Sequence, residues 1–113
     1  MKFEDILKGQ ESEGKEKHVP VIEVGEHGGA DMVHVIVGKE TPHPNTTEHH
    51  IAWLQLYGQK KDNGQIINLG KAAFAPGYTS PSSWFRVPIA DFKAFCALSY
   101  CNIHGVWANC LEI

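Results

Sequence analysis

The stretch HIAWLQLYGQKKDNGQIINLGKAAFA, residues 50–75, decides the fold class. In its first part, Ile51, Trp53, Gln55 and Tyr57 alternate with Ala52, Leu54 and Leu56, as the two faces of a β-strand do. Asn63 and Gly64 follow, and this dipeptide is the strongest short-range signal for a hairpin turn. Residues 66–75 then read as the returning strand. The stretch therefore predicts an antiparallel pair of strands.

Shorter runs on either side predict further strands, at residues 18–26, 32–39, 84–89, 92–100 and 106–113. Helical periodicity is nearly absent, and residues 3–8 could form one helical turn. Six or seven short antiparallel strands in a chain of 113 residues predict an all-β fold. An immunoglobulin-like β-sandwich of about seven strands is the leading expectation.

Length and composition limit the classes of function. A chain of 113 residues is long enough for a single domain with its own core, here with residues 1–15 as a polar N-terminal extension. The net charge of −3 argues against binding to nucleic acid or anionic lipid. No apolar run approaches the ~20 residues that span a bilayer. The N-terminus is acidic where an export signal would be apolar, so we expect a cytoplasmic protein.

The chain has three cysteines, Cys96, Cys101 and Cys110. This odd number is too small for a disulfide framework, and we expect Cys96 and Cys110 to be buried apolar side chains. Cys101 differs because it stands in C-x2-H spacing with His104. That spacing can bring a thiolate and an imidazole onto the same metal ion.

The segment PHPNTTEHH, residues 42–50, concentrates three of the seven histidines. His49 and His50 are adjacent at the entrance of a strand, so their side chains should point to opposite sides. We expect His43 and His49 to converge on one ion and His50 to face away from it, with a role in supporting hydrogen bonds.

His18 is a further candidate ligand, whereas His27 and His34 match no ligand pattern and are expected to be structural or solvated. We expect the site in loops at one end of the sandwich. The candidate ligands are His18, His43, His49, Cys101 and His104.

Four imidazoles and one thiolate differ from the closed tetrahedral set of a structural zinc site. Five donors of mixed softness suit a redox-active iron with one position left open for a substrate. A blue-copper-like electron carrier is the main alternative, although Met1 and Met32 are the only methionines and neither follows the Cys101 segment. A non-catalytic metal-binding sandwich is the other.

Three segments, GKEKHVPVIE (14–23), PHPNTTEHHI (42–51) and ALSYCNIHGVW (97–107), resemble the one-iron superoxide reductases, the neelaredoxin or class II desulfoferrodoxin family. The resemblance implies one mononuclear iron in an immunoglobulin-like sandwich. It also implies that the five candidate ligands are four equatorial histidines and an axial cysteine. The larger family members hold a second iron in four cysteines, which is excluded here because no cysteine precedes Cys96.

The same resemblance implies the reduction of superoxide to hydrogen peroxide by one electron, without release of oxygen. This reaction would detoxify superoxide in an anaerobe or microaerophile. Glu16 would bind the iron in the ferric state, and Lys17 would supply positive charge at the open position. A rubredoxin-like protein would donate the electron, and the protein would be a homo-oligomer, with a tetramer as the family's pattern.

Overall fold

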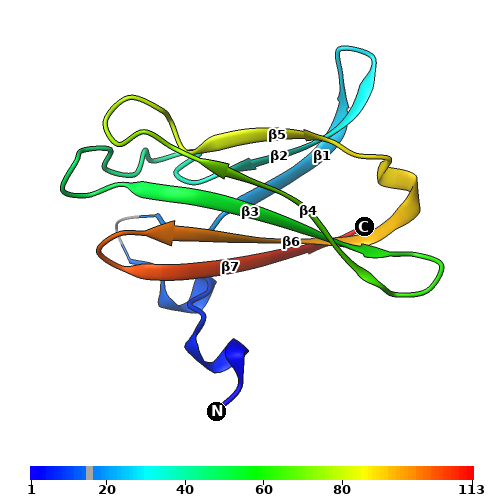
Figure 1. Cartoon of the computed structure of the whole chain (residues 1–113), viewed down its shortest axis with the longest axis horizontal. Coiled ribbons are helices and arrows are strands. Elements are labelled where there is room, and N and C mark those ends of the chain that lie inside the picture. The colour runs from blue at the N-terminus through cyan, green and yellow to red at the C-terminus, as the bar shows by residue number, and fades with distance from the viewer. Residues whose placement is uncertain (15–16) are drawn as a thin grey trace.

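The computed structural model spans the chain and describes residues 1–14 and 17–113. Two antiparallel sheets pack face to face, and short 3-10 turns precede the first strand and connect two later ones (Figure 1). The elements are η1 (Phe3–Ile6), η2 (Gln10–Ser12), β1 (Val21–His27), β2 (Ala30–Ile36), β3 (Ile51–Lys60), β4 (Ile66–Ala73), β5 (Ser82–Arg86), η3 (Ile89–Asp91), β6 (Phe92–Cys101) and β7 (Gly105–Glu112).

One sheet has the strand order β1-β2-β5 and the other β4-β3-β6-β7. Every pairing is antiparallel. Within the part of the chain that is described, seven strands thus form a two-layer sandwich, which confirms the predicted fold class.

The β3–β4 hairpin forms where the sequence predicts it. Its two strands pair from Trp53 with Ala73 to Gln59 with Ile66. Gly64 takes the left-handed conformation, with φ at 71°, that a glycine adopts without steric cost. The amide of Lys60 donates to the carbonyl oxygen of Gln65 at 2.9 Å and closes the turn.

The core lies between the two sheets and is built from alternate residues of their strands. Val33 and Val35 of β2 and Leu54 and Leu56 of β3 are fully buried, as period-two patterning requires. The buried cluster is completed by Ile22, Val37, Ile51, Val87, Phe92, Phe95, Ala97 and Cys101. Cys101 therefore belongs both to the core and to the end of β6.

The strand boundaries differ from the predicted ones mainly at two prolines. β1 begins at Val21, after Pro20, rather than at residue 18. β5 ends at Arg86 rather than at residue 89, and Pro88 instead starts the η3 turn. Proline has no N–H to donate to a ladder, which accounts for both shifts.

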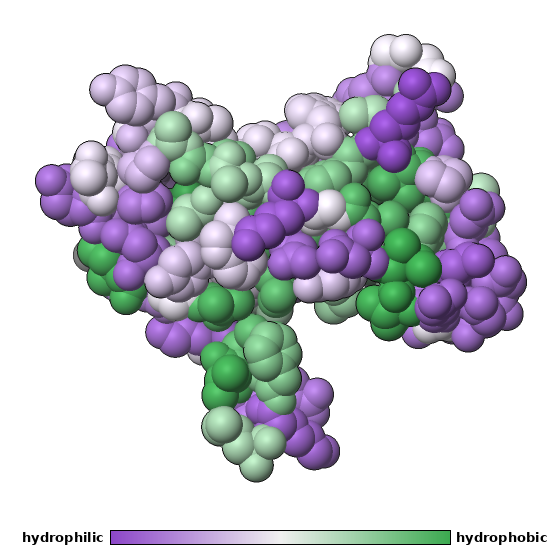
Figure 2. Space-filling view, viewed as in Figure 1, coloured by the Kyte–Doolittle hydropathy of each residue, from purple (hydrophilic) through white to green (hydrophobic). Residues whose placement is uncertain are grey.

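Lys8 of the N-terminal segment pairs with the open edge of β7, and the residues before it extend away from the sandwich. The amide of Lys8 donates to Val106 O at 3.2 Å, and Lys8 O accepts from the amide of Ala108 at 2.8 Å. The residues before Lys8 project from the body (Figures 1 and 2). Two of them, Phe3 and Ile6, are exposed apolar side chains. Among the described residues, no helix is long and apolar enough to cross a membrane.

Candidate metal centre

Three separate segments bring the candidate ligands to one end of the sandwich, at the left of Figure 1. His18 precedes β1, and His43 and His49 lie in the loop between β2 and β3. Cys101 is the last residue of β6, and His104 lies in the turn that leads to β7. The sequence predicted a site in loops at one end, and the structure places the four histidines in loops there and Cys101 at the end of a strand.

The donor atoms lie close enough to share one ion. One ligand atom from each of His18, His43, His49 and Cys101 lies within 4.8 Å of the other three. His104 adjoins this group, with its Nδ1 3.2 Å from Nε2 of His18 and 3.7 Å from Sγ of Cys101. Donors ~2.1 Å from an ion are about 3 Å apart when adjacent and about 4.2 Å apart when opposite. Four donors thus lie together and His104 lies next to two of them, an arrangement that is compatible with a single ion once the side chains close on it.

The hydrogen bond of His43 selects the nitrogen that faces the group. Nδ1 of His43 lies 2.7 Å from the carbonyl oxygen of Pro44, which can only accept a hydrogen bond. Nδ1 therefore carries the proton, and the lone pair of the neutral ring lies on Nε2. A ligand histidine is commonly oriented in this way by a backbone carbonyl.

The turn after β6 presents its sulfur and its imidazole together. Cys101 is fully buried, and its Sγ accepts the backbone N–H of His104 at 3.4 Å. Gly105 follows with φ at 86°, so the chain can reverse directly after the histidine. Hydrogen bonds to a ligating sulfur are one of the factors that set the reduction potential of the metal it binds.

Asn102 joins the two loops that hold His49 and Cys101. Its Oδ1 accepts the N–H of His50 at 2.8 Å, and its Nδ2 donates to the carbonyl oxygen of Glu48 at 2.9 Å. Both partners flank His49. The sequence did not single out Asn102, since an asparagine in a turn has many possible roles.

The ring of His18 is fixed by packing. It stacks on Trp107 with ring centroids 4.6 Å apart and an interplanar angle of 13°. Nζ of Lys8 lies 5.5 Å from the centroid of Trp107 and donates to the carbonyl oxygen of His104 at 3.0 Å. Lys8 of the N-terminal segment thus contacts the ring on which His18 stacks and the backbone of His104.

Burial is uneven across the group. His18 and His43 are each 5% exposed and Cys101 is 0% exposed, whereas His49 and His104 are partly exposed. The rings of His49 and His104 therefore extend toward the surface, although Nε2 of His49 is itself buried, and the sulfur of Cys101 lies in the core.

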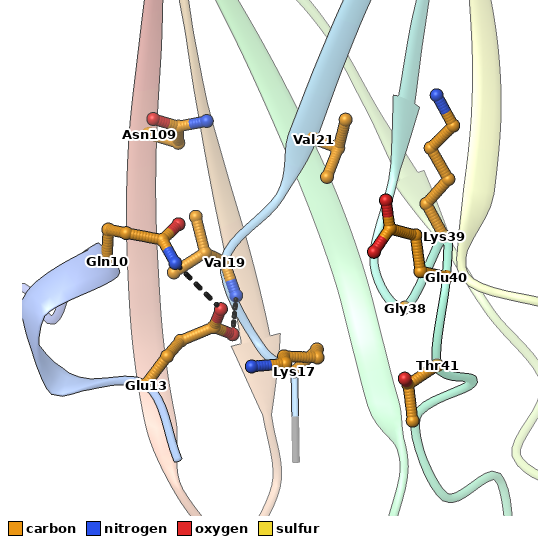
Figure 3. Close-up of a pocket in the computed structure, with 10 residues that line it drawn as sticks. All are labelled: Gln10, Glu13, Lys17, Val19, Val21, Gly38, Lys39, Glu40, Thr41 and Asn109. Atoms are coloured by element: carbon orange, nitrogen blue, oxygen red, sulfur yellow. Dashed lines mark hydrogen bonds between the residues drawn. The ribbon is translucent and has the colours of Figure 1, made fainter. Parts of the chain in front are cut away.

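Lys17 and Glu16 were the two candidate residues outside the five donors. Lys17 is exposed, and its Nζ donates to the carbonyl oxygen of Gly14 at 3.1 Å. It borders the cavity of Figure 3 rather than the donor group. Glu16 lies outside the described residues.

The remaining histidines lie away from the donor group. Nδ1 of His50 contacts the carbonyl oxygen of Thr46 at 3.0 Å, so this ring supports the loop. His34 stacks on Trp84 at 4.0 Å, and His27 meets the same ring edge-on at 4.6 Å. These positions agree with the structural roles that the sequence predicted.

The prediction for Cys96 and Cys110 was wrong. The two residues form a disulfide between directly paired positions of β6 and β7. Cys110 is exposed and Cys96 is half-buried, so the bridge lies on the outer face of the sheet. Their spacing in the sequence does not reveal a pairing that depends on the register of two strands. Cys101 is the cysteine that stays outside the bridge.

The donor set fits a metal ion of intermediate softness. One thiolate with four imidazoles suits iron, copper or zinc better than magnesium or calcium, which prefer oxygen ligands. Five donors exceed the closed tetrahedral set of structural zinc. The arrangement offers donors from both the core and the partly exposed end of the sandwich.

Comparisons with known proteins agree with this geometry. The desulfoferrodoxin family profile matches residues 10–110. A superoxide reductase of Pyrococcus abyssi is 44% identical over 98% of this chain and 98% of its own length. A crystal structure of a superoxide reductase in the oxidized state is 38% identical, with a TM-score of 0.84 over 99% of both chains. The superoxide reductase (neelaredoxin) of Ignicoccus hospitalis is 35% identical, with a TM-score of 0.80 over 100% of this chain and 98% of its own. The profile spans most of the sequence and the relatives match at full length, and the chain therefore belongs to the desulfoferrodoxin family.

Proposed function

We propose that this protein is a superoxide reductase, which converts superoxide to hydrogen peroxide with one electron and two protons and releases no oxygen. The observation that supports this most is the convergence of Cys101 with four imidazoles at a partly exposed end of the sandwich. The names of the relatives point to the same reaction.

We propose iron as the resident metal, held by His18, His43, His49, His104 and Cys101. A blue-copper site would use one cysteine and two histidines, and it would leave two of the assembled imidazoles without a role. A structural zinc site would be complete with four donors. The family supports iron, and the five-donor set is compatible with it.

When bound, a ferrous ion supplies the electron that superoxide takes up. The chain's own residues set the conditions for that transfer. Cys101 would bind the ion as a thiolate from the buried side, and the substrate would approach from the side of His49 and His104. The partial exposure of His49 and His104 gives water access to the same side, and water can deliver the two protons.

Glu16 and Lys17 are proposed to act at the open side. Lys17 would attract superoxide by its positive charge, because local potentials raise association rates of anions by ~10- to 1000-fold. Glu16 would occupy the open position in the ferric state. Both proposals follow from the family motif around His18, and a lysine directly before a ligand can reach its neighbourhood through a long side chain.

The electron is proposed to come from a separate rubredoxin-like protein. Within residues 1–14 and 17–113, a single group of histidine and cysteine side chains could hold a metal. An external donor must therefore return the ion to the ferrous state after each turnover.

We propose that the chain forms one iron-binding domain that works as a cytoplasmic homo-oligomer, by family pattern a tetramer, without nucleic-acid or membrane partners. The projecting N-terminal segment supports the oligomer, since its apolar side chains Phe3 and Ile6 are exposed in the single chain. Light scattering of the purified protein would give its mass.

Anaerobic metal analysis of the purified protein, followed by oxidation and assay with superoxide, tests the function directly. We expect one iron per chain and a visible thiolate-to-metal band after oxidation. We also expect one hydrogen peroxide for each superoxide consumed, with no oxygen produced. A copper centre, a colourless zinc protein, or oxygen released at half the superoxide consumed would each refute the proposal. Mass spectrometry, an oxygen electrode and a peroxide assay provide these measurements.

A further inference from the structure

We propose that Glu13 is a positioning residue of the metal centre, whose carboxylate anchors the backbone of the ligand His18. The role of that centre rests on the proposed function. The anchoring itself depends only on contacts within the chain. Glu13 lies outside the group of donor side chains, so it acts through His18 and not on the ion.

The carboxylate of Glu13 makes two backbone contacts at once. Its Oε1 accepts the N–H of His18 and, at 2.8 Å, the N–H of Val19. Figure 3 shows this oxygen aimed at Val19, with the amide of Gln10 on the other oxygen at 3.5 Å. Two N–H groups on one charged oxygen form a stronger anchor than two neutral bonds would.

Other side chains hold the same segment from the opposite side. Oγ of the buried Ser99 donates to the carbonyl oxygen of His18 at 2.7 Å. Nδ2 of Asn109 donates to the carbonyl oxygen of Pro20 at 3.0 Å. Ser99 and Asn109 fix the carbonyl side, whereas Glu13 fixes the amide side. His18 can therefore shift as a ligand once the Glu13 contacts are lost, even though the core below it stays intact.

The contacts of Glu13 also join the two ends of residues 14–17. This segment begins directly after Glu13 and ends directly before His18, so the anchor brings its ends together. The bond from Lys17 Nζ to Gly14 O adds a second link between those ends. Glu13 thus helps to fix Lys17, which is bonded to Gly14 and directly precedes the anchored His18.

A cavity of about 380 Å³ places Glu13 and Lys17 on a shared wall (Figure 3). The negative charge of Glu13 opposes the field that Lys17 would offer to an approaching anion. The charge of Glu13 alone therefore would not favour the approach of an anion. Its hydrogen bonds to the backbone of His18 and Val19 account for its position.

Four variants separate geometry from charge. Glu13→Ala removes the acceptor and the charge, and Glu13→Gln keeps an oxygen acceptor without the charge. Glu13→Asp keeps the charge on a shorter side chain. Glu11→Ala is the matched control, because Glu11 is an exposed acid of the same segment that contacts neither backbone amide of the His18 pair.

Hydrogen exchange of the His18 and Val19 amides in the metal-free protein is the first measurement. In Glu13→Ala we expect both amides to exchange about tenfold faster, since a hydrogen bond to a charged group contributes about that factor. Glu13→Gln should restore protection to within about threefold of the unmodified protein, because a neutral hydrogen bond is weaker by about that factor. Glu13→Asp should resemble Glu13→Ala, and Glu11→Ala should change nothing.

Release of iron to a chelator is the second measurement. We expect the loaded Glu13→Ala protein to lose iron several times faster, with rescue by Glu13→Gln. Unchanged amide exchange in Glu13→Ala would overturn the proposal, and so would a Glu13→Gln variant that behaves as Glu13→Ala. Neither measurement depends on turnover. A protein that fails to reduce superoxide would therefore refute the proposed function and leave the Glu13 result standing.

Discussion

Oγ of Ser99 donates a hydrogen bond of 2.7 Å to the carbonyl oxygen of His18, a residue 81 positions earlier in the chain. Ser99 lies two residues before the end of β6 and is 0% exposed, and His18 is 5% exposed. The bond therefore connects a ligand segment with no regular structure to a central strand of the sandwich.

Ser99→Ala should lower the free energy of unfolding by about 1–3 kcal/mol, because it leaves the buried carbonyl of His18 without its donor. Urea unfolding of the metal-free protein measures this loss without any contribution from a bound ion. Ser83→Ala, on the outer strand β5, is a suitable control and should change the value by less than about 0.5 kcal/mol. Equal stability of Ser99→Ala and the unmodified protein would contradict the role of this bond.

Gly38→Ala should displace His43 and destabilise the fold. Gly38 has φ at 77°, and a Cβ there would lie 2.6 Å from the amide nitrogen of His43 and 2.9 Å from Thr41 O. Gly28 has φ at 61° and nothing within 4 Å of the same position, so Gly28→Ala measures the cost of the backbone conformation alone. We expect about 1–2 kcal/mol for Gly28→Ala and clearly more for Gly38→Ala. If urea unfolding gave similar losses of free energy for the two variants, the backbone around His43 would be able to move away from the added Cβ at little cost.

The strands and most of the candidate ligands could be predicted from the sequence, because they depend on patterns between residues close together in the chain. Alternating residues and the Asn63–Gly64 turn specify strands and a hairpin, and C-x2-H places Cys101 beside His104. Glu13, Ser99 and Asn102 could not be found in this way. Each is an ordinary polar residue, and its partners are defined only once the sheets have packed.

The disulfide shows the same limit. Cys96 and Cys110 are 14 residues apart, and a shift of one residue in the register of β6 and β7 would place them on opposite faces. The register depends on the length of the turn that contains His104. The sequence spacing alone does not determine it.

Cys101→Ser should abolish the visible thiolate band of the iron-loaded protein and most of its activity. The thiolate is the donor responsible for that band, and serine offers only a hydroxyl. Cys96→Ser and Cys110→Ser are matched controls that should keep the band. They should lose up to about 3 kcal/mol of stability, the value expected for a closed loop of this length. A colourless Cys110→Ser protein would show that Cys101 is not the ligand.

Stability at low pH should depend on Glu23. The hydrogen bond from Lys39, followed by that of His34, holds the pKa of the Glu23 carboxyl below its ordinary value of 4.5. A lowered pKa contributes stability above 4.5 that is lost as the pH falls through the folded-state value. The same contact raises the pKa of Lys39 above 10.5, so its contribution fades as the pH rises through that raised value.

Melting temperatures of the unmodified protein and of Glu23→Gln at pH 7 and pH 3 test this linkage. We expect the unmodified protein to be the more stable at pH 7 and the difference to shrink at pH 3. The effect should be small, because the Glu23 side chain is 40% exposed and water screens the pair. Glu26→Gln, on the same strand, provides the control. A difference that grows on acidification would have the wrong sign for a lowered pKa.

Lys17 should govern how fast superoxide reaches the centre. Its exposed side chain directly precedes the ligand His18, and we propose that its charge adds to the local potential at the open side. Lys17→Ala should slow the bimolecular encounter, and Lys17→Glu should slow it further because the sign of the field is reversed. The rate of the unmodified protein should fall with added salt, since the screening length is about 8 Å at ~0.15 M. Lys71→Ala, on the outer face of β4, is the control and should leave the rate unchanged. Pulse radiolysis of these proteins at two salt concentrations measures each rate, and equal rates for all of them would mean that Lys17 is an ordinary surface residue.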